Sequence, residues 1–302
     1  MPPTLTIDTA GAAALQYLQN AEKASVLGIT SRGVFLRLPG ERVVFLSTER
    51  WRGPLTLNLA GKAAPLQNLA IGAAAQVSEM RITFPQTNLV ISLVGTMPWT
   101  AYPPESAPLP FEKRLHHLYE TARLLLVTQQ TSDPLHPSSP LAALLPALLG
   151  WQDGSRRPDP AQSVRLASLQ AALRSRQAPA VAAALGSWLG LGVGLTPSGD
   201  DLAIGLLLAL SRWGAGLETG LEAGDILADL LPLAQYKTTL LSVNLLECAA
   251  HGQADERLLQ ALDELVSGSL PPSACSRLLA DYGHTSGLDA LVGIAAVLVN
   301  RA

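Results

Sequence analysis

Apolar and polar positions alternate along the first hundred residues. The stretch from Leu55 to Leu59 reads LTLNL, so every second residue is apolar. This period of two is typical of a β-strand with one buried face, and Pro39-Gly40 between two apolar runs marks a turn. We therefore expect residues 1–97 to form a small, mostly antiparallel β domain. Its strands are expected at 26–29, 34–38, 43–46, 55–59, 77–84 and 88–94, after a short helix at 9–20.

The pattern changes after a proline-rich stretch. Residues 98–110 contain five prolines and are expected to form a linker. Beyond them apolar residues recur every three or four positions, as at Leu115, Leu118 and Ala122, which is the spacing of an amphipathic helix. We expect residues 111–302 to form an all-α helical bundle, so the predicted fold class is α+β. Helices are expected at 112–129, 140–149, 161–174, 179–189, 200–212, 224–231, 238–251, 256–266, 273–282 and 286–300.

One motif occurs twice in the helical part. Residues 192–201 read GVGLTPSGDD, and residues 283–289 read GHTSGLD. Each copy ends in Ser-Gly-x-Asp and continues into an apolar segment, so each is expected to open a helix. Ser198 and Ser286 are the predicted N-caps, and Asp201 and Asp289 are predicted to reach back to the cap amide.

The glycines of the motif suggest a use beyond capping. Gly199 and Gly287 are expected to leave first-turn amides open to the oxygen atoms of a ligand, at the positive end of the helix dipole. Gly205 and Gly293 lie one turn past the aspartates, where a missing side chain lets two helices cross closely. The alternative is purely structural, since Ser-x-x-Asp is a common cap and a helical glycine is often a packing device.

A third polar segment lies between the two copies. Lys237-Thr238-Thr239 is expected to start a helix, with Thr238 or Thr239 as its cap. Lys237 at such a start suits a phosphate or carboxylate, but a solvated lysine beside an ordinary cap explains it equally well.

Composition narrows the classes of function. The chain has 302 residues, of which 48% are apolar and 15% charged, as in a protein with a well-filled interior. Its net charge is −3 and its basic residues form no stripe, which argues against a nucleic-acid partner. The apolar run from Leu202 to Leu210 is too short to cross a membrane, and no basic-then-apolar leader starts the chain, so we expect a cytoplasmic protein. Cys248 and Cys275 are isolated, which predicts small core residues and no zinc site.

Three segments resemble a bacterial family of unknown function, DUF2877. They are Gly192 to Asp201, Lys237 to Leu246 and Gly283 to Gly293. The best-understood members of that family look like an accessory subunit of oxamate carbamoyltransferase. The resemblance implies a subunit that works beside two others in purine or allantoin breakdown. The complex would exchange oxalurate and phosphate for oxamate and carbamoyl phosphate. The chain alone is expected to be inactive, because its motifs do not assemble a nucleophile, a base and a group that orients the base.

All four of these compounds are small anions. Glycine-rich helix N-termini are well suited to bind small anions. Under this interpretation Asp200 is the candidate for acid or base chemistry, and His284 is a candidate proton carrier. The substrate-binding candidates share hydroxyl, backbone amide or ammonium donors. They are Gly194, Thr196, Ser198, Gly199, Lys237, Thr238, Thr239, Thr285, Ser286 and Gly287.

Two other classes of function stay open from the residues. In one, Asp200, Asp201 and Asp289 bind Mg²⁺ in a helical-bundle hydrolase similar to ADP-ribosyl hydrolases, and Mg²⁺ is the only cofactor considered. In the other, the chain is a non-catalytic scaffold or regulatory subunit, because no nucleophile and base pair is evident.

Overall fold

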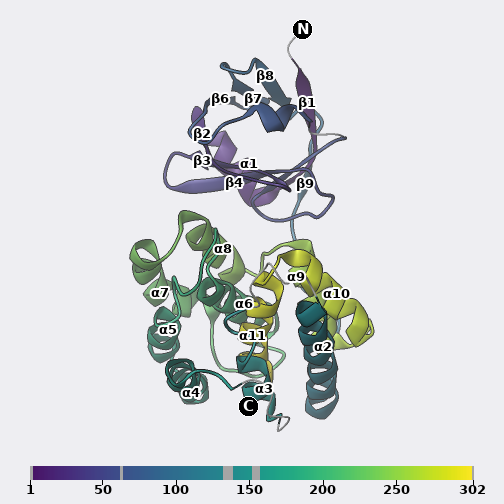
Figure 1. Ribbon diagram of the computed structural model, residues 1–302, viewed down its shortest axis with the longest axis vertical. Coiled ribbons are helices and arrows are strands. Elements are labelled where there is room, and N and C mark those ends of the chain that lie inside the picture. The colour runs from purple at the N-terminus through teal and green to yellow at the C-terminus, as the bar shows by residue number, and fades with distance from the viewer. Residues whose placement is uncertain (1–2, 62–63, 132–138, 152–156, 301–302) are drawn as a thin grey trace. The chain divides into compact units, whose positions relative to one another are not determined.

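The computed structural model describes residues 3–61, 64–131, 139–151 and 157–300. The chain divides into two compact units, Met1–Ala101 and Tyr102–Ala302. The first is built around a β-sheet, and every helix that the structure describes in the second belongs to a single packed group (Figure 1).

Eight strands of the first unit close into a barrel (Figure 1). The order is β5-β4-β3-β2-β6-β7-β8-β1, and β1 pairs with β5 to complete the ring. Alternate residues such as Leu36, Leu46 and Ile82 point inward and are fully buried, as the period of two requires. The strands are β1 (Thr4–Gly11), β2 (Lys23–Thr30), β3 (Gly33–Leu38), β4 (Arg42–Ser47), β5 (Thr56–Leu59), β6 (Ala74–Ser78), β7 (Arg81–Phe84) and β8 (Leu89–Ser92); β9 (Met97–Trp99) pairs with β1, α1 (Ala12–Gln19) follows β1, and a 3-10 turn covers Ala64–Asn68.

The predicted fold class was wrong in its architecture. A small, mostly antiparallel β domain ahead of a helical bundle was expected, whereas the strands form a closed barrel with parallel pairs. The parallel pairs are β1 with β8, β1 with β9 and β4 with β5. Alternation shows which face of a strand is buried but not which strand lies beside it. The pairing of β1 with β5, which closes the barrel, therefore leaves no signal in the local sequence.

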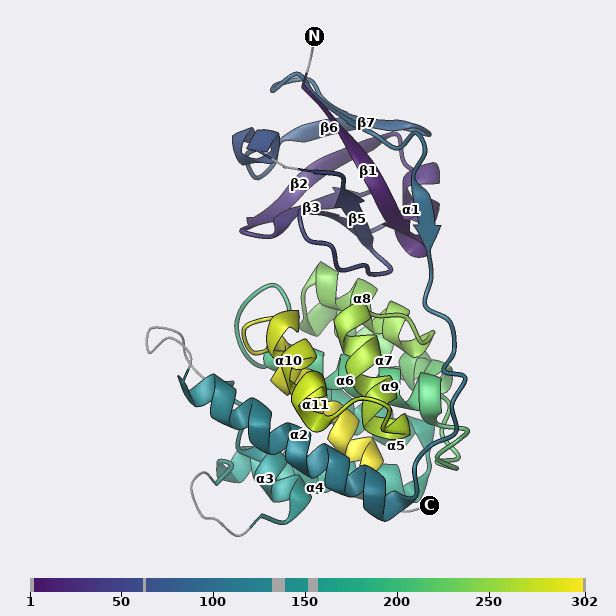
Figure 2. The same cartoon turned by 90° about the vertical axis from the view of Figure 1, so that its right-hand side faces the viewer.

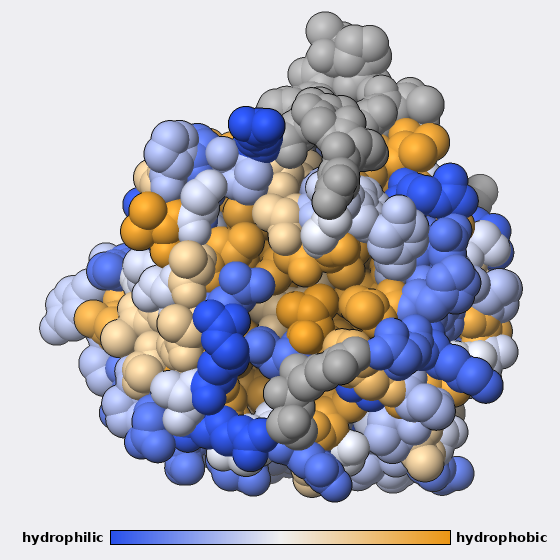
Figure 3. All heavy atoms as spheres, turned by 90° about the horizontal axis from the view of Figure 1, so that it is seen from below, coloured by the Kyte–Doolittle hydropathy of each residue, from blue (hydrophilic) through white to orange (hydrophobic). Residues whose placement is uncertain are grey.

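The second unit packs its helices around α6 (Ser198–Trp213) and α11 (Ser286–Leu298) (Figure 2). Both are buried along nearly their whole length, which is why they are apolar on every side. On the face seen from below, apolar side chains gather near the centre with hydrophilic ones around them (Figure 3). The other helices are α2 (Phe111–Thr131), α3 (Leu144–Leu149), α4 (Pro160–Ser175), α5 (Ala178–Gly186), α7 (Ala223–Lys237), α8 (Leu240–Ala250), α9 (Glu256–Ser267) and α10 (Pro272–Tyr282).

Two glycines bring α6 and α11 into contact through their backbones. A Cβ atom added at Gly205 would lie 2.1 Å from the carbonyl oxygen of Ala290, and one added at Gly293 would lie 1.9 Å from that of Leu202. No side chain fits at such a distance, so the crossing depends on glycine. The prediction that the two helices cross at these glycines is confirmed.

Candidate functional site

The two motif copies open α6 and α11, but their serines are not the caps. Each helix begins at its serine, and the cap positions are Pro197 and Thr285, neither with a capping side-chain hydrogen bond. In the first copy the Pro197 carbonyl accepts from the amides of Asp200 and Asp201 at 2.8 and 3.1 Å. The predicted N-cap role of Ser198 and Ser286 is therefore wrong, because each helix starts one residue earlier than a serine cap requires.

The serines instead face the aspartates of the opposite copy. The side chain of Ser286 lies at the Asp201 carboxylate, and that of Ser198 lies at the Asp289 carboxylate. We call Asp201 and Asp289 the aspartate pair. Each copy thus supplies a serine to the acid of the other copy, so the two motifs meet although they are far apart in sequence.

Threonines of the motif complete the surroundings of the aspartate pair. The hydroxyl of Thr196 donates to Oδ2 of Asp201 at 3.3 Å, and the side chain of Thr285 lies at Asp289. Ser139, from the segment before α3, donates to Oδ1 of Asp289. Both carboxyl groups are almost completely buried. Hydroxyl donors from three parts of the chain thus surround two acids shielded from water.

Burial changes the acidity of the pair. Loss of solvent raises the pKa of Asp201 well above its usual range, and the charge of Asp289 raises it further, against the effect of the Ser286 and Thr196 hydroxyls. Burial also raises the pKa of Asp289 to about 6, although hydroxyls oppose this. Burial thus disfavours the charged form of Asp201.

One oxygen atom of each acid accepts no well-formed hydrogen bond, although hydroxyl groups lie near both carboxylates. Within the described residues, Oδ1 of Asp201 and Oδ2 of Asp289 are buried and accept no hydrogen bond of normal geometry. Buried polar atoms of this kind are uncommon, and they often mark a functional group.

Asp200 is turned to other partners. Its fully buried carboxylate accepts the Gly190 amide at 2.8 Å through Oδ1 and the Thr238 hydroxyl through Oδ2. It thereby ties two segments to α6: the loop that contains Gly190, Gly192 and Gly194, here called the glycine-rich loop, and the segment before α8. In the described part of the chain no group of three or more His, Cys, Asp and Glu side chains is arranged to hold a metal ion. The Mg²⁺ site at Asp200, Asp201 and Asp289, considered as an alternative, stays a prediction.

The motif glycines pack against backbone. A Cβ atom at Gly199 would lie 1.9 Å from the Trp188 carbonyl oxygen, and one at Gly287 would lie 1.9 Å from that of Leu279. The Gly199 amide donates to Leu191 at 2.9 Å. It is therefore not open to a ligand in this structure, which corrects the reason for which Gly199 was singled out.

The remaining candidates surround the start of α8 and the two loops. Thr239 is the N-cap of α8 and accepts the Ser242 amide at 3.1 Å, which confirms the predicted cap; its hydroxyl lies 2.6 Å from the Leu195 carbonyl oxygen. The Lys237 ammonium donates to the Gly186 carbonyl at the end of α5 at 2.7 Å. Gly194 is exposed, with a φ of 103°. His284 is exposed, and its carbonyl accepts from the Gln129 side chain at 3.0 Å.

Two residues near the aspartate pair were missed. Ser139 lies 150 positions before Asp289 and belongs to no motif, so the sequence carried no signal for it. Tyr282 immediately precedes the second copy; burial and then the Asp201 charge raise the pKa of its phenol well above the usual range. Its position beside the repeat was the only available hint.

Removing the hydroxyl that Asp200 binds is expected to destabilise the helical unit. Thr238→Val keeps the shape of the side chain but leaves Oδ2 of Asp200 buried without a donor, at a cost of about 1–3 kcal/mol. Urea unfolding followed by circular dichroism measures the change. Thr238→Ser, which restores a hydroxyl, is the control, and equal losses in both variants would contradict a role for this hydrogen bond.

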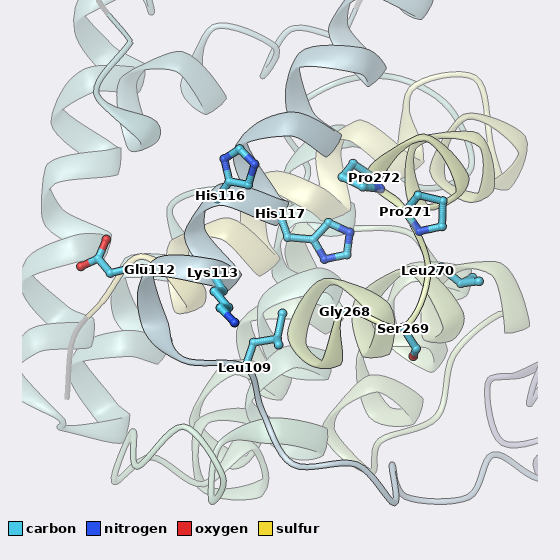
Figure 4. A pocket seen from close by; sticks show the side chains of 10 residues that line it. All are labelled: Leu109, Glu112, Lys113, His116, His117, Gly268, Ser269, Leu270, Pro271 and Pro272. Carbon is cyan, nitrogen blue, oxygen red and sulfur yellow. The ribbon is translucent and has the colours of Figure 1, made fainter.

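A wide cavity lies away from the motifs. It has a volume of about 630 Å³ and is lined by the start of α2 and the connection between α9 and α10. Figure 4 shows the imidazole of His117 turned toward this connection, while Glu112 points away. None of the predicted site residues lines it, so this cavity is separate from the chemistry of the motifs.

Comparison with known families identifies the region that holds both motifs. Residues 188–298 match the family described as oxamate carbamoyltransferase subunit AllH, which confirms the resemblance seen in the three segments. The match runs from the loop before α6 to the end of α11 and leaves out the barrel. No solved structure matches the chain significantly. Among the described helices, none combines the length and the apolar character needed to cross a membrane.

Proposed function

We propose that the helical unit serves as a subunit of a carbamoyltransferase-type complex and holds a small anionic substrate where α6 and α11 begin. The family match supports association with a carbamoyltransferase. The proposed substrates are oxalurate, oxamate, phosphate or carbamoyl phosphate, in cytoplasmic purine or allantoin breakdown. The observation that carries the substrate site is the reciprocal contact of Ser286 with Asp201 and of Ser198 with Asp289.

The chemistry of this contact suits a molecule with an amide at one end and a negative charge at the other. The unpaired oxygen atoms of Asp201 and Asp289 are acceptors for the N–H groups of a carbamoyl or oxamate amide. The hydroxyls and the positive ends of two helices favour the anionic end. Burial raises the pKa of Asp201 and so disfavours its charged form, which lessens the repulsion that an approaching anion meets.

A substrate must pass the glycine-rich loop to reach these groups. A Cβ atom at Gly192 would lie 2.7 Å from the Ser198 nitrogen, so the loop lies directly over the first residue of α6. Gly190, Gly192 and Gly194 all have positive φ, a conformation that glycine adopts without strain. We propose that this loop opens to admit the substrate.

The loop also presents apolar side chains to solvent. Val193 is 87% exposed and Leu195 is 40% exposed. Tyr236, which precedes the Lys237 whose carbonyl packs against Gly190, is 92% exposed. Large exposed apolar side chains near a site are typical of an interface, and we propose that another subunit of the complex docks here.

Binding of oxamate to the purified chain tests the substrate site. Calorimetry should show that oxamate binds more tightly than oxalate, which lacks the amide. Asp201→Ala or Ser286→Ala should weaken oxamate binding about tenfold or more, because each removes a hydrogen bond inside a dry site.

Ser276→Ala is the matched control, since Ser276 is a buried serine on the neighbouring helix α10. It should bind oxamate as the unchanged chain does. Equal affinity for oxamate and oxalate, or no effect of the Asp201 and Ser286 variants, would contradict the site. Absence of oxamate binding would favour a scaffold subunit instead.

A further inference from the structure

A second cavity lies at the opposite ends of the two central helices. Its volume is about 270 Å³, and Leu210 of α6 and Val297 of α11 form part of its wall. Leu210 is twelve residues beyond Ser198, which corresponds to roughly 18 Å along a helix. This cavity is therefore separate from the aspartate pair.

The cavity combines an apolar floor with a cationic rim. Leu173, Leu210 and Val297 are nearly buried, and Arg174 and Arg176 line the same cavity. Within the described part of the chain, neither guanidinium group has a hydrogen-bond or ion-pair partner, and no acidic residue lines the cavity. Two guanidinium groups at the mouth of an apolar hollow attract an oxyanion attached to an apolar body.

The backbone at Arg176 points to a role for its side chain. Arg176 ends α4 with a φ of 54°, in the left-handed region where glycine is the usual residue. An arginine there carries strain, and such strain is commonly found at functional positions. Across from it a Cβ atom at Gly220 would lie 3.4 Å from Cδ of Arg176, so the glycine leaves room for the arginine side chain.

We propose that this cavity binds a small organic carboxylate with a short branched hydrocarbon body. The carboxylate would lie between the guanidinium groups of Arg174 and Arg176, and the hydrocarbon would lie against Leu173, Leu210 and Val297. The volume is just below the usual range of pockets for drug-sized ligands, which suits an acid of about six to nine non-hydrogen atoms.

Calorimetry with 4-methylpentanoate and its neutral amide tests this site on the full chain. The carboxylate should bind, and the amide should bind about tenfold more weakly or not at all, since charge-assisted hydrogen bonds are the stronger ones. Arg176→Gly and Arg174→Gln should each weaken carboxylate binding about tenfold.

Arg176→Gly also relieves the left-handed strain, so its melting temperature should not fall and a loss of binding cannot come from unfolding. Arg277→Gln, an exposed change on α10, is the control and should leave binding unchanged. Equal binding of acid and amide, no binding of the acid, or full affinity in Arg176→Gly would overturn the proposal.

Discussion

Gly293→Ala is expected to lower the free energy of unfolding of the helical unit by about 3 kcal/mol or more. The added methyl group would lie 1.9 Å from the Leu202 carbonyl oxygen and 2.7 Å from the Leu206 nitrogen. These are backbone atoms of α6, so they cannot turn aside as a side chain does, and the two central helices must separate. Separation also weakens the packing along α6 and α11, which form the middle of the core. Urea unfolding followed by the circular dichroism of the helices measures the loss.

Gly224→Ala is the matched control for this substitution. Gly224 lies near the start of α7, and a Cβ atom there would meet nothing within 4 Å. Alanine is the better helix former, so this variant should gain up to about 1 kcal/mol. A similar gain in Gly293→Ala would show that the helices do not cross as closely as described.

Asp289→Asn is expected to stabilise the helical unit at neutral pH. The folded protein raises the pKa of Asp289 from 3.8 to about 6, because burial disfavours the charged form. This shift corresponds to about 3 kcal/mol. Below pH 4 the acid is largely protonated in both the folded and the unfolded protein, so its burial costs no stability. The free energy of unfolding falls as the pH rises through about 6, because the unfolded protein can release the proton more easily than the folded protein. An amide carries no charge at any pH, so the variant should gain up to about 3 kcal/mol at pH 7 and little at pH 4.

Urea unfolding of both proteins between pH 4 and pH 7 checks this difference. Asp229→Asn serves as the control, because Asp229 is exposed on α7 and its replacement should change stability by less than about 0.5 kcal/mol at either pH. A stabilisation of Asp289→Asn that does not depend on pH would contradict the explanation by burial. If the variant also binds oxamate poorly, the chain retains a destabilising acid because its function needs it.

The sequence was informative wherever the signal was local. Helical spacing after Phe111 indicated helices that the structure contains, and Thr239 was recognisable as a cap from its own neighbours. The segment expected as one strand at 77–84 is a hairpin of β6 and β7, with Ser78 paired to Arg81. A tight turn without glycine or proline left no mark in the alternation, which explains this error.

The candidate site was recognised only in part. The repeat pointed to the two helix starts, which depend on residues within a few positions of one another. It pointed to the glycine crossing because both copies place a glycine at the same distance past the aspartate. The pairing of Ser286 with Asp201, the approach of Ser139 and the blocked amide of Gly199 all join residues distant in sequence or depend on where a neighbouring backbone runs.

Local chemistry by itself determined the helices, the repeated motif and the glycines at which two backbones meet, because propensity and periodicity act over a few residues. Tertiary structure alone decided the closure of the barrel through β1 and the burial of Asp201 and Asp289. Burial sets the acidity of these groups, and it depends on how the whole chain packs around them, which no pattern within the motif encodes.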